Sequence, residues 1–394
     1  MKILFITEVY LPYLSGVTVS LATFVKYLAR QEHEIAIIAP GYPQRQYKNV
    51  NVEDAVRDGG GNITILRLPS FPSFRYPGFR VALPMKRKMW KFIKEFKPDV
   101  IHSQAPFTLG RIGAKFAKKL NVPLFYTFHT MFHDYVHFIP LIPGFVTVPL
   151  MIRYVRNFCH KCSRVVVPTP IVEDVVHTTY NIKTPLVVIP TGVDDDAIST
   201  IDRQRIRKGL NLDPADKVLL YCGRLSKEKN IEFLIDAMVP LLEKRPDMRL
   251  MIVAGGPLLE FYKKYAIKKK VEKNVIFTGQ VTRDVVYDYI AAGDLFVSAS
   301  KTETQGLVLM EAKAIGIPAI GIAEGGTINM IEDGVDGFLV QDNINQFTEK
   351  VLEVVNDDEL LQKLKEGAIE QTHKKFLASV TAQKLVDSYN SVLS

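Results

Sequence analysis

The sequence is poor in cysteine and has no long apolar run, and each absence excludes a class of protein. Three cysteines in 394 residues indicate a chain that works in a reducing compartment, so we expect a cytoplasmic location. No stretch reaches the roughly eighteen apolar residues that a membrane-spanning helix needs. The first apolar run, residues 2–7, is followed at once by Glu8 and is too short for a signal peptide. We interpret it as a buried strand.

The cysteines do not form a recognisable site. Cys159 and Cys162 make a single CxxC pair, and Cys222 stands alone. A zinc site would need a second pair of ligands, and a redox pair would need a thioredoxin-like context. We therefore interpret Cys159 and Cys162 as ordinary helix cysteines.

Positive charge is concentrated in the first half of the chain. The whole sequence carries a formal charge of +8, but residues 1–190 contain 24 Lys and Arg against 11 Asp and Glu, whereas the remainder contains 26 against 31. This asymmetry predicts an anionic partner for the first half only. Phospholipid, nucleic acid or an acidic substrate would each fit.

Short apolar runs alternate with amphipathic segments, which predicts α/β architecture with parallel sheets covered by helices on both faces. The length, 394 residues, favours two domains. Buried strands are expected at 2–7, 34–40, 63–69, 99–103, 123–129, 164–169 and 186–190, and again at 217–223, 249–256, 274–279, 294–300, 318–322 and 337–340. Two such series predict two Rossmann-like, doubly wound domains, 1–190 and 191–375, that face a shared cleft.

Ligands of open parallel sheets bind beyond the carboxyl ends of the strands. Ser15 and Gly16 follow the first strand, where glycine allows a ligand to approach the backbone; an ordinary serine N-cap is the alternative. His129 ends the fifth strand and could bind a sugar hydroxyl or stabilise charge, with His133 and His137 as weaker candidates. No acidic triad accompanies the three histidines, so we expect no metal site.

A polar turn follows the first strand of the second domain. It contains Arg224 and Lys229, whose planar fork and mobile point charge suit a diphosphate. A solvated surface turn is the alternative. The loop "AGGP" (254–257), with Gly256, comes after the next strand and permits another close approach of a ligand.

The stretch "ETQGLVLME" (303–311) holds two carboxylates around the start of a helix. Glu303 lies in the turn after a strand, and Gly306 exposes the backbone N–H groups of Leu307 and Val308, which can bind a phosphate. Glu303 can then bind sugar hydroxyls, and Glu311 can accept both hydroxyls of a ribose. The pattern predicts a sugar-nucleotide site.

These motifs together resemble the retaining GT-B glycosyltransferases of family GT4, over nearly the whole chain. The resemblance rests on "SGV" (15–17), "FHT" (128–130), the turn with Arg224 and Lys229, "AGGP" (254–257), "ETQGLVLME" (303–311) and "EGGTINMIEDGVDGFLV" (324–340). It implies a GT-B fold whose last helix, about 376–394, crosses back onto the first domain. It also implies a nucleotide-sugar donor on the second domain, an acceptor on the first, retention of configuration, and no metal or other cofactor.

The resemblance gives each candidate residue an expected role. Arg224 and Lys229 would hold the donor diphosphate and stabilise the leaving group, and Glu311 would hold the ribose. Glu303 would bind sugar hydroxyls with help from the backbone of Gln305 and Gly306. Gly16 would lie close to the phosphates, and His129 would face the transferred sugar. Family habit favours UDP, and UDP-glucose is the donor that we expect.

"TETQGL" (302–307) and "HTMFHDYVHF" (129–138) resemble the branch that glycosylates diacylglycerol in bacterial membranes, the 1,2-diacylglycerol 3-glucosyltransferases and monoglucosyldiacylglycerol synthases. The aromatic loop 70–79, the basic amphipathic helix 84–98 and the apolar, proline-broken segment 138–152 favour peripheral binding to the inner face of an anionic membrane. The alternative is that helix 84–98 buries its apolar stripe in the core and shows only a basic face to solvent.

Three other functions compete with glycosylation of a lipid. A GT4 enzyme could take a soluble sugar, polysaccharide or small-molecule acceptor. A nucleic-acid-binding protein would use the basic half, but the sequence has no aromatic platform or named RNA-binding motif, so we expect no nucleic-acid partner. A sugar-nucleotide sensor would lack catalysis, which the presence of Glu303, Glu311, Arg224 and Lys229 opposes.

Overall fold

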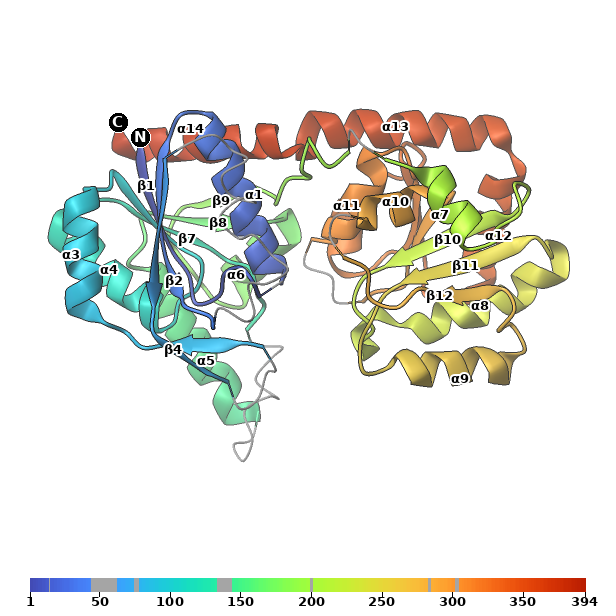
Figure 1. Ribbon diagram of the computed structural model, residues 1–394, viewed down its shortest axis with the longest axis horizontal. Helices are drawn as coiled ribbons and strands as arrows, with labels where there is room; N and C mark the ends of the chain where they lie inside the picture. Colours follow the sequence, from blue (N-terminus) through green and yellow to red (C-terminus); the bar gives the residue numbers. More distant parts are fainter. Residues whose placement is uncertain are drawn as a thin grey trace. The chain divides into compact units, whose positions relative to one another are not determined.

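The chain folds into two compact α/β units in the computed structural model, which describes residues 1–13, 15–43, 62–73, 78–132, 144–198, 201–282, 285–301 and 305–394. The first unit is Met1–Gly192 with Ala378–Ser394, and the second is Val193–Leu377 (Figure 1). The sequence placed these divisions after residues 190 and 375, two residues earlier in each case.

The first unit is built on a seven-stranded parallel sheet of order β3-β2-β1-β6-β7-β8-β9. Its strands are β1 (Lys2–Ile6), β2 (Glu34–Pro40), β3 (Ile63–Leu68), β6 (Val100–Ser103), β7 (Leu124–Thr127), β8 (Arg164–Val167) and β9 (Leu186–Val188). Because successive side chains point to opposite faces, these apolar runs present two buried faces and need helices on both.

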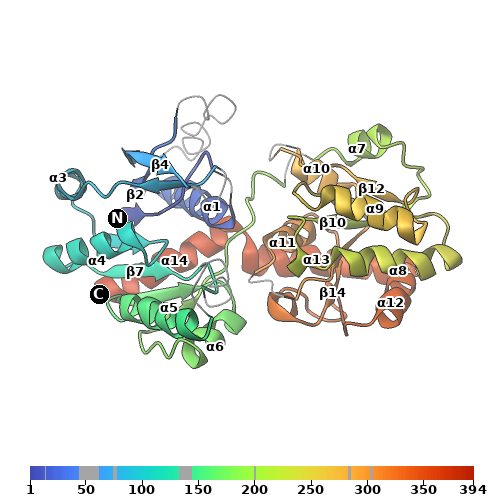
Figure 2. The ribbon, with the colours of Figure 1, turned by 90° about the horizontal axis from the view of Figure 1, so that it is seen from below.

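Helices cover both faces of this sheet (Figure 2). Ile3, Phe5 and Phe125 point to the face that α1 (Gly16–Arg30) and α14 (Ala378–Leu393) cover. The alternate strand residues, such as Leu4 and Tyr126, point to the other face. That face is covered by α3 (Lys86–Phe96), α4 (Thr108–Leu120), α5 (Gly144–Cys159) and α6 (Pro170–Thr178).

Two expectations for the first unit need correction. Part of the expected loop 70–79 is strand: β4 (Ser70–Pro72) pairs antiparallel with β5 (Arg80–Ala82), and residues 74–77 lie outside the described part. The apolar stripe of α3 faces the core, because Met89 and Ile93 are fully buried there. Trp90 packs on Phe116 of α4, with ring centroids 5.0 Å apart. Helix α3 therefore presents mainly its basic face to solvent.

The second unit has a six-stranded parallel sheet of order β12-β11-β10-β13-β14-β15. Its strands are β10 (Lys217–Cys222), β11 (Met248–Val253), β12 (Val275–Phe277), β13 (Leu295–Ser298), β14 (Ala319–Ile322) and β15 (Gly337–Val340). This order is that of a dinucleotide-binding Rossmann fold. The thirteen strands of the two parallel sheets all match predicted segments, with ends that differ by at most three residues.

Alternation along the strands again divides the core of the second unit into two layers. One layer joins the sheet to α8 (Ile231–Lys244), α9 (Leu259–Lys269) and α12 (Ile344–Asn356). The other joins it to α7 (Arg203–Gly209), α10 (Val286–Ala291) and α11 (Leu307–Ala314). Helix α13 (Asp358–Phe376) contacts both α11 and α12. The predicted pair of Rossmann-like domains is confirmed.

Helix α14 returns to the first unit, as predicted, and a buried hydrogen-bond network holds it there. The Tyr389 hydroxyl lies 2.6 Å from Nδ1 of His102 on β6, and Nε2 of His102 lies 2.7 Å from the Thr127 hydroxyl on β7. The Tyr389 ring also meets Phe125 edge to face at 4.8 Å. Burial lowers the pKa of His102 to about 3, so the ring is neutral and can accept one of these bonds.

We expect Tyr389→Phe to lower the free energy of unfolding by about 1–3 kcal/mol, because it leaves a buried His102 nitrogen without its partner. The change would appear as a lower urea midpoint and faster amide exchange in α14. Asn390→Ala, at an exposed position of the same helix, is the control and should have little effect. Equal stability of Tyr389→Phe and the wild type would show that the network does not hold α14.

Candidate functional site

The second unit has a topological switch point between neighbouring strands β10 and β13. Helix α8, after β10, and helix α11, after β13, cover opposite faces of the sheet. The carboxyl ends of the strands at such a switch point are where Rossmann folds bind nucleotides. The described segments at this place are residues 223–230, 299–301 and 305–307, which include Arg224, Lys229, Gln305, Gly306 and Leu307.

Hydrogen bonds join the two segments at the switch point. The backbone N–H of Lys301 donates to the Glu228 carbonyl oxygen at 3.4 Å, and the Ser300 hydroxyl lies 3.5 Å from the same oxygen. The single helical turn Lys227–Lys229 is thereby held beside the segment that leads from β13 to α11. The structure thus brings the Arg224–Lys229 turn and the start of α11 to one edge of one sheet.

Arg224 and Lys229 flank Glu228 in this turn. The Arg224 side chain is 71% exposed, with Nη2 3.9 Å from Oε1 of Glu228. Burial alone would raise the pKa of Glu228. The Ser226 hydroxyl, a backbone N–H, Arg224 and Lys229 outweigh burial and hold this pKa below its usual value. The turn therefore stabilises negative charge on a resident carboxylate, and its exposed arginine can take an anionic ligand.

Two glycines shape the backbone around the turn. Gly306 is the N-cap of α11 with φ of +70°, a left-handed conformation that favours glycine, and Leu307 and Val308 begin the helix. Gly256, after β11, has φ of +142°, and a Cβ there would lie 3.4 Å from the Leu225 carbonyl oxygen. The start of α11 offers the N–H groups that can hold a phosphate. Gln305, just before the helix, is buried.

Glu311 lies within α11 and is only 1% exposed. The Tyr287 hydroxyl, from α10, donates a hydrogen bond to its Oε1 at 3.2 Å. This hydrogen bond orients the Glu311 carboxylate, which would otherwise rotate freely on a flexible side chain. Sequence reasoning missed Tyr287, because α10 has only six residues and no motif marks it.

A buried ion pair anchors α11 to the turn before β15. Nζ of Lys313 lies 2.5 Å from Oδ2 of Asp336 and donates to the Met330 carbonyl oxygen at 2.5 Å, and both charged side chains are almost fully buried. Burial lowers the pKa of Lys313 and raises that of Asp336. The pair ties the helix that carries Glu311 to the turn before β15.

Glu303 lies outside the described residues, together with Thr302 and Thr304. His133 and His137 lie outside them as well. Their expected roles therefore remain predictions from the sequence.

In the first unit, three polar side chains follow neighbouring strands at the carboxyl edge: Glu8 after β1, Gln104 after β6 and His129 after β7. Nε2 of His129 lies 2.8 Å from Oε1 of Gln104. An amide oxygen only accepts, so Nε2 carries the proton and Nδ1 is left as an acceptor. Burial lowers the pKa of His129 to about 4, so the ring is neutral near pH 7. Neutral His129 can therefore accept a hydrogen bond from a hydroxyl.

The fold does not require a glycine at position 16. Gly16 begins α1, and the hydroxyl of Ser15 caps the helix by accepting from the Thr18 N–H at 3.2 Å. A Cβ at Gly16 would meet no described heavy atom within 4 Å, and its φ is not positive. Space is thus open beside the first turn of α1.

Glu8 is a further residue that sequence reasoning did not select as a site candidate. Its Oε1 accepts the Leu109 N–H at 2.6 Å at the start of α4, and burial raises its pKa to about 6. Glu8 directly follows the predicted first strand, and Ser103 and Gln104 end the strand beside it. These positions could have marked Glu8 as a candidate at the carboxyl edge of the sheet. Glu8 therefore caps α4 in the described structure.

Cys159, Cys162 and Cys222 are buried free thiols. Burial raises the pKa of Cys159 to about 12, which keeps it an unreactive thiol. Within the described ranges, no group of three His, Cys, Asp or Glu side chains is arranged to hold a metal ion.

Gln104→Glu should raise the pKa of His129 by about one unit or more, because a carboxylate favours the charged imidazole. NMR titration of the His129 ring protons measures this shift directly. The wild-type pKa lies below its ordinary value of 6.5, so the stability that neutral His129 contributes is complete above about pH 6.5 and is lost toward pH 4.

Gln341→Glu makes the same change of charge at an exposed position of the second unit and should leave the His129 titration unchanged. A His129 titration that does not move in Gln104→Glu would contradict the contact between the two side chains.

Two protein-family models match the chain. Residues 14–197 match "Glycosyltransferase Family 4", and residues 202–371 match "Glycosyl transferases group 1". Alpha-monoglucosyldiacylglycerol synthase of Streptococcus pneumoniae is 33% identical over 345 residues, 86% of this chain and 75% of that protein. The protein of the same name from Acholeplasma laidlawii is 27% identical over the full length of both chains.

Solved structures share the fold at lower identity. The crystal structure of Anabaena HepE in complex with UDP covers 99% of this chain and 100% of that one, with a TM-score of 0.77 and 19% identity. WaaG, a glycosyltransferase involved in lipopolysaccharide biosynthesis, covers 98% and 99%, with a TM-score of 0.69 and 18% identity. The chain therefore belongs to the group 1 glycosyl transferases of glycosyltransferase family 4, and it has their two-domain GT-B fold.

Proposed function

We propose that this glycosyltransferase moves glucose from UDP-glucose to a hydroxyl of diacylglycerol or another membrane lipid, with retention of configuration and without a metal. The observation that carries the proposal is the switch point of the second unit, where Arg224, Lys229 and the start of α11 lie at the ends of two neighbouring strands. A nucleoside diphosphate needs this combination of cations and free N–H groups.

The donor would occupy the second unit. Arg224 and Lys229 bind its diphosphate together with the N–H groups at the start of α11, and Gly256 lets the phosphates approach the backbone. Glu311, oriented by Tyr287, accepts the ribose hydroxyls. Glu303 and the backbone of Gln305 and Gly306 hold the sugar.

The proposed chemistry is electrostatic. The bond from the anomeric carbon to the diphosphate breaks, and the acceptor oxygen bonds to the same face of that carbon while its proton passes to the departing diphosphate. Negative charge grows on the diphosphate during this step, where Arg224 and Lys229 stabilise it. These groups supply the charge that a divalent cation supplies in other transferases, so transfer should persist in EDTA.

The acceptor would bind the first unit near its carboxyl edge, where the neutral ring of His129 presents Nδ1. Nδ1 of neutral His129 can accept a hydrogen bond from a hydroxyl of the transferred sugar.

Surface apolar groups on the first unit favour a lipid acceptor. In α5, Phe145 is 81% exposed, Leu150 is 61% exposed and Val146 is 39% exposed. Helix α3 adds a basic face, although its apolar stripe is buried. Among the described residues, no helix combines the length and the hydropathy of a bilayer-spanning segment. We therefore propose peripheral binding to an anionic membrane, on its cytoplasmic side, through α5 and α3. The names of the relatives from Streptococcus pneumoniae and Acholeplasma laidlawii support the same acceptor.

The test is to incubate the purified protein with radiolabelled UDP-glucose, EDTA and liposomes that contain diacylglycerol and anionic phospholipid. Label extracted into chloroform as a monoglucosyl lipid would support the donor and the acceptor, and NMR of its anomeric proton would report the configuration. UDP release with all label left in water would replace the lipid by a soluble acceptor. No UDP release from any of several sugar nucleotides would overturn the proposal and favour a sensor.

Lys229→Ala should weaken binding of UDP-glucose by about tenfold or more, because it removes one charge-assisted contact to the diphosphate. Calorimetry measures this affinity without turnover. Glu311→Ala should weaken donor binding as well, through loss of the ribose contact.

Lys227→Ala is the matched control, because Lys227 lies in the same helical turn but is exposed, whereas Lys229 is half-buried. Its donor affinity should match that of the wild type, and circular dichroism should stay native in all three variants. Native donor affinity in both Lys229→Ala and Glu311→Ala would refute this assignment of the donor site.

A further inference from the structure

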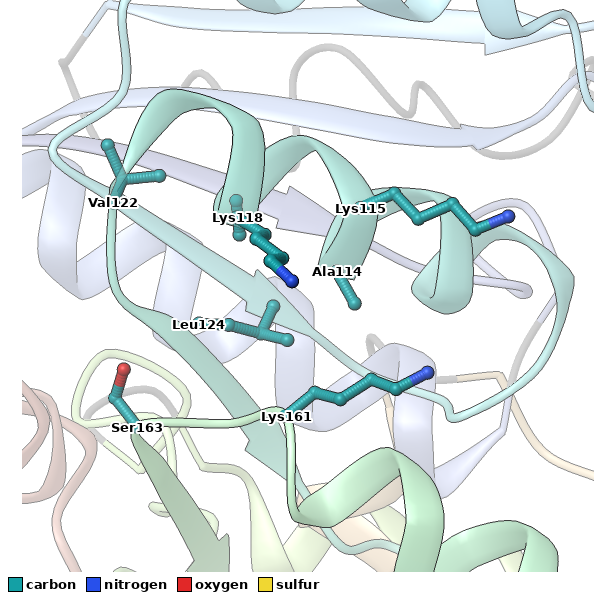
Figure 3. A pocket seen from close by; sticks show the side chains of 8 residues that line it. Ala114, Lys115, Lys118, Val122, Leu124, Lys161 and Ser163 are labelled. Atoms are coloured by element: carbon teal, nitrogen blue, oxygen red, sulfur yellow. The ribbon is translucent and has the colours of Figure 1, made fainter.

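We infer that the first unit carries a second anion site, separate from the proposed substrate site, that binds a phosphate ester. The site is a cavity of about 520 Å³ lined by Ala114, Lys115, Ala117, Lys118, Val122, Leu124, Lys161 and Ser163. These residues come from α4, from the start of β7 and from the turn between α5 and β8 (Figure 3). We refer to it as the lysine pocket.

Three lysines line this pocket. Lys115 and Lys118 are one turn apart on α4 and so share a face of the helix, and Lys161 comes from the turn across the cavity. In Figure 3 the side chains of Lys115 and Lys161 extend in the same direction on either side of Ala114. Among the described residues, no carboxylate forms an ion pair with any of the three. Unneutralised like charges around a concave wall create a positive potential that favours an anion.

The remaining lining completes a site for one kind of ligand. Ser163 is exposed and offers a hydroxyl at the mouth. Ala114, Ala117 and Leu124 form an apolar floor, along which the lysine stems can lie. Ammonium groups bind phosphate as mobile point charges, and a phosphate monoester carries a charge close to −2 at neutral pH. The volume exceeds that of a bare phosphate, so the ligand would carry a small organic group such as glycerol.

The lysine pocket lies at the edge of the sheet opposite to Gln104 and His129. Leu124 begins β7 and Ser163 precedes β8, whereas His129 follows the carboxyl end of β7. The four residues of β7 separate the two edges by about 13 Å at roughly 3.3 Å per residue. A phosphate ester in the pocket therefore would not occupy the place of the transferred sugar. It would act as an anchor or as a regulator.

The test uses calorimetry on the full chain with two probes. One probe is glycerol 3-phosphate, and the other is dihexanoyl-phosphatidylglycerol kept below its micelle concentration, with dihexanoyl-phosphatidylcholine as the zwitterionic reference. We expect saturable binding of one anionic probe with a dissociation constant of about 1 mM at low salt. Binding should weaken as the salt concentration rises. Saturation with glycerol 3-phosphate identifies a soluble ester as the source, and saturation with the lipid alone identifies a headgroup.

The double variant Lys115→Gln/Lys161→Gln should bind the same probe about tenfold or more weakly, because it removes two of three cations. The matched control, Lys268→Gln/Lys273→Gln, removes the same charge from exposed positions of the second unit and should bind like the wild type. All four lysines are exposed, so both variants should fold.

Absence of saturable binding would overturn the inference, and so would equal losses in the two double variants or equal binding of the zwitterionic lipid. Neither UDP-glucose nor diacylglycerol takes part in these titrations. The lysine pocket and the proposed transfer activity can therefore fail independently.

Discussion

The buried pair of Lys313 and Asp336 is the constraint on which the candidate donor site depends. Helix α11 has only eight residues. Its N-cap, Gly306 in the left-handed conformation, and its buried Glu311 must both be held in place. Two opposite charges in an apolar interior have few alternative arrangements, and removal of either partner alone typically costs about 3–5 kcal/mol. The Lys313 contact to the Met330 carbonyl oxygen extends this restraint to the segment before β15. The buried contacts of Lys313 therefore fix the position of α11 and, with it, that of Glu311.

Most of the fold could be predicted because its strands are buried on both faces. Runs such as Glu34–Pro40 and Gly337–Val340 read as continuous apolar segments, and their boundaries were predicted to the residue. The β4–β5 hairpin was missed, since its strands have three residues each and lie among prolines. The orientation of α3 was a harder problem. A basic helix with an apolar stripe fits a membrane surface and a protein core equally well, and only the packing of Met89, Ile93 and Trp90 decides between them.

For the candidate site, sequence reasoning found the residues that follow strands but not those that orient them. Arg224 and Lys229 were recognisable from their place after an apolar run. Tyr287 and Gln104 could not be found in this way, because their importance lies in contacts with Glu311 and His129 across the fold. The ring of His129 illustrates the difference. The sequence indicates a histidine at a strand end, whereas its protonated nitrogen follows from the amide oxygen opposite.

The discontinuous first unit has a consequence for biosynthesis. Its helix α14 is separated in the chain from the rest of the unit by the whole of Val193–Leu377. The ribosome therefore delivers every residue of the second unit before the last helix of the first. Until then His102 lacks its Tyr389 partner, and the part of the first sheet's face that α14 covers beside α1 exposes apolar surface. The second unit is contiguous, so it can finish folding before the first, which reverses the usual N-to-C order.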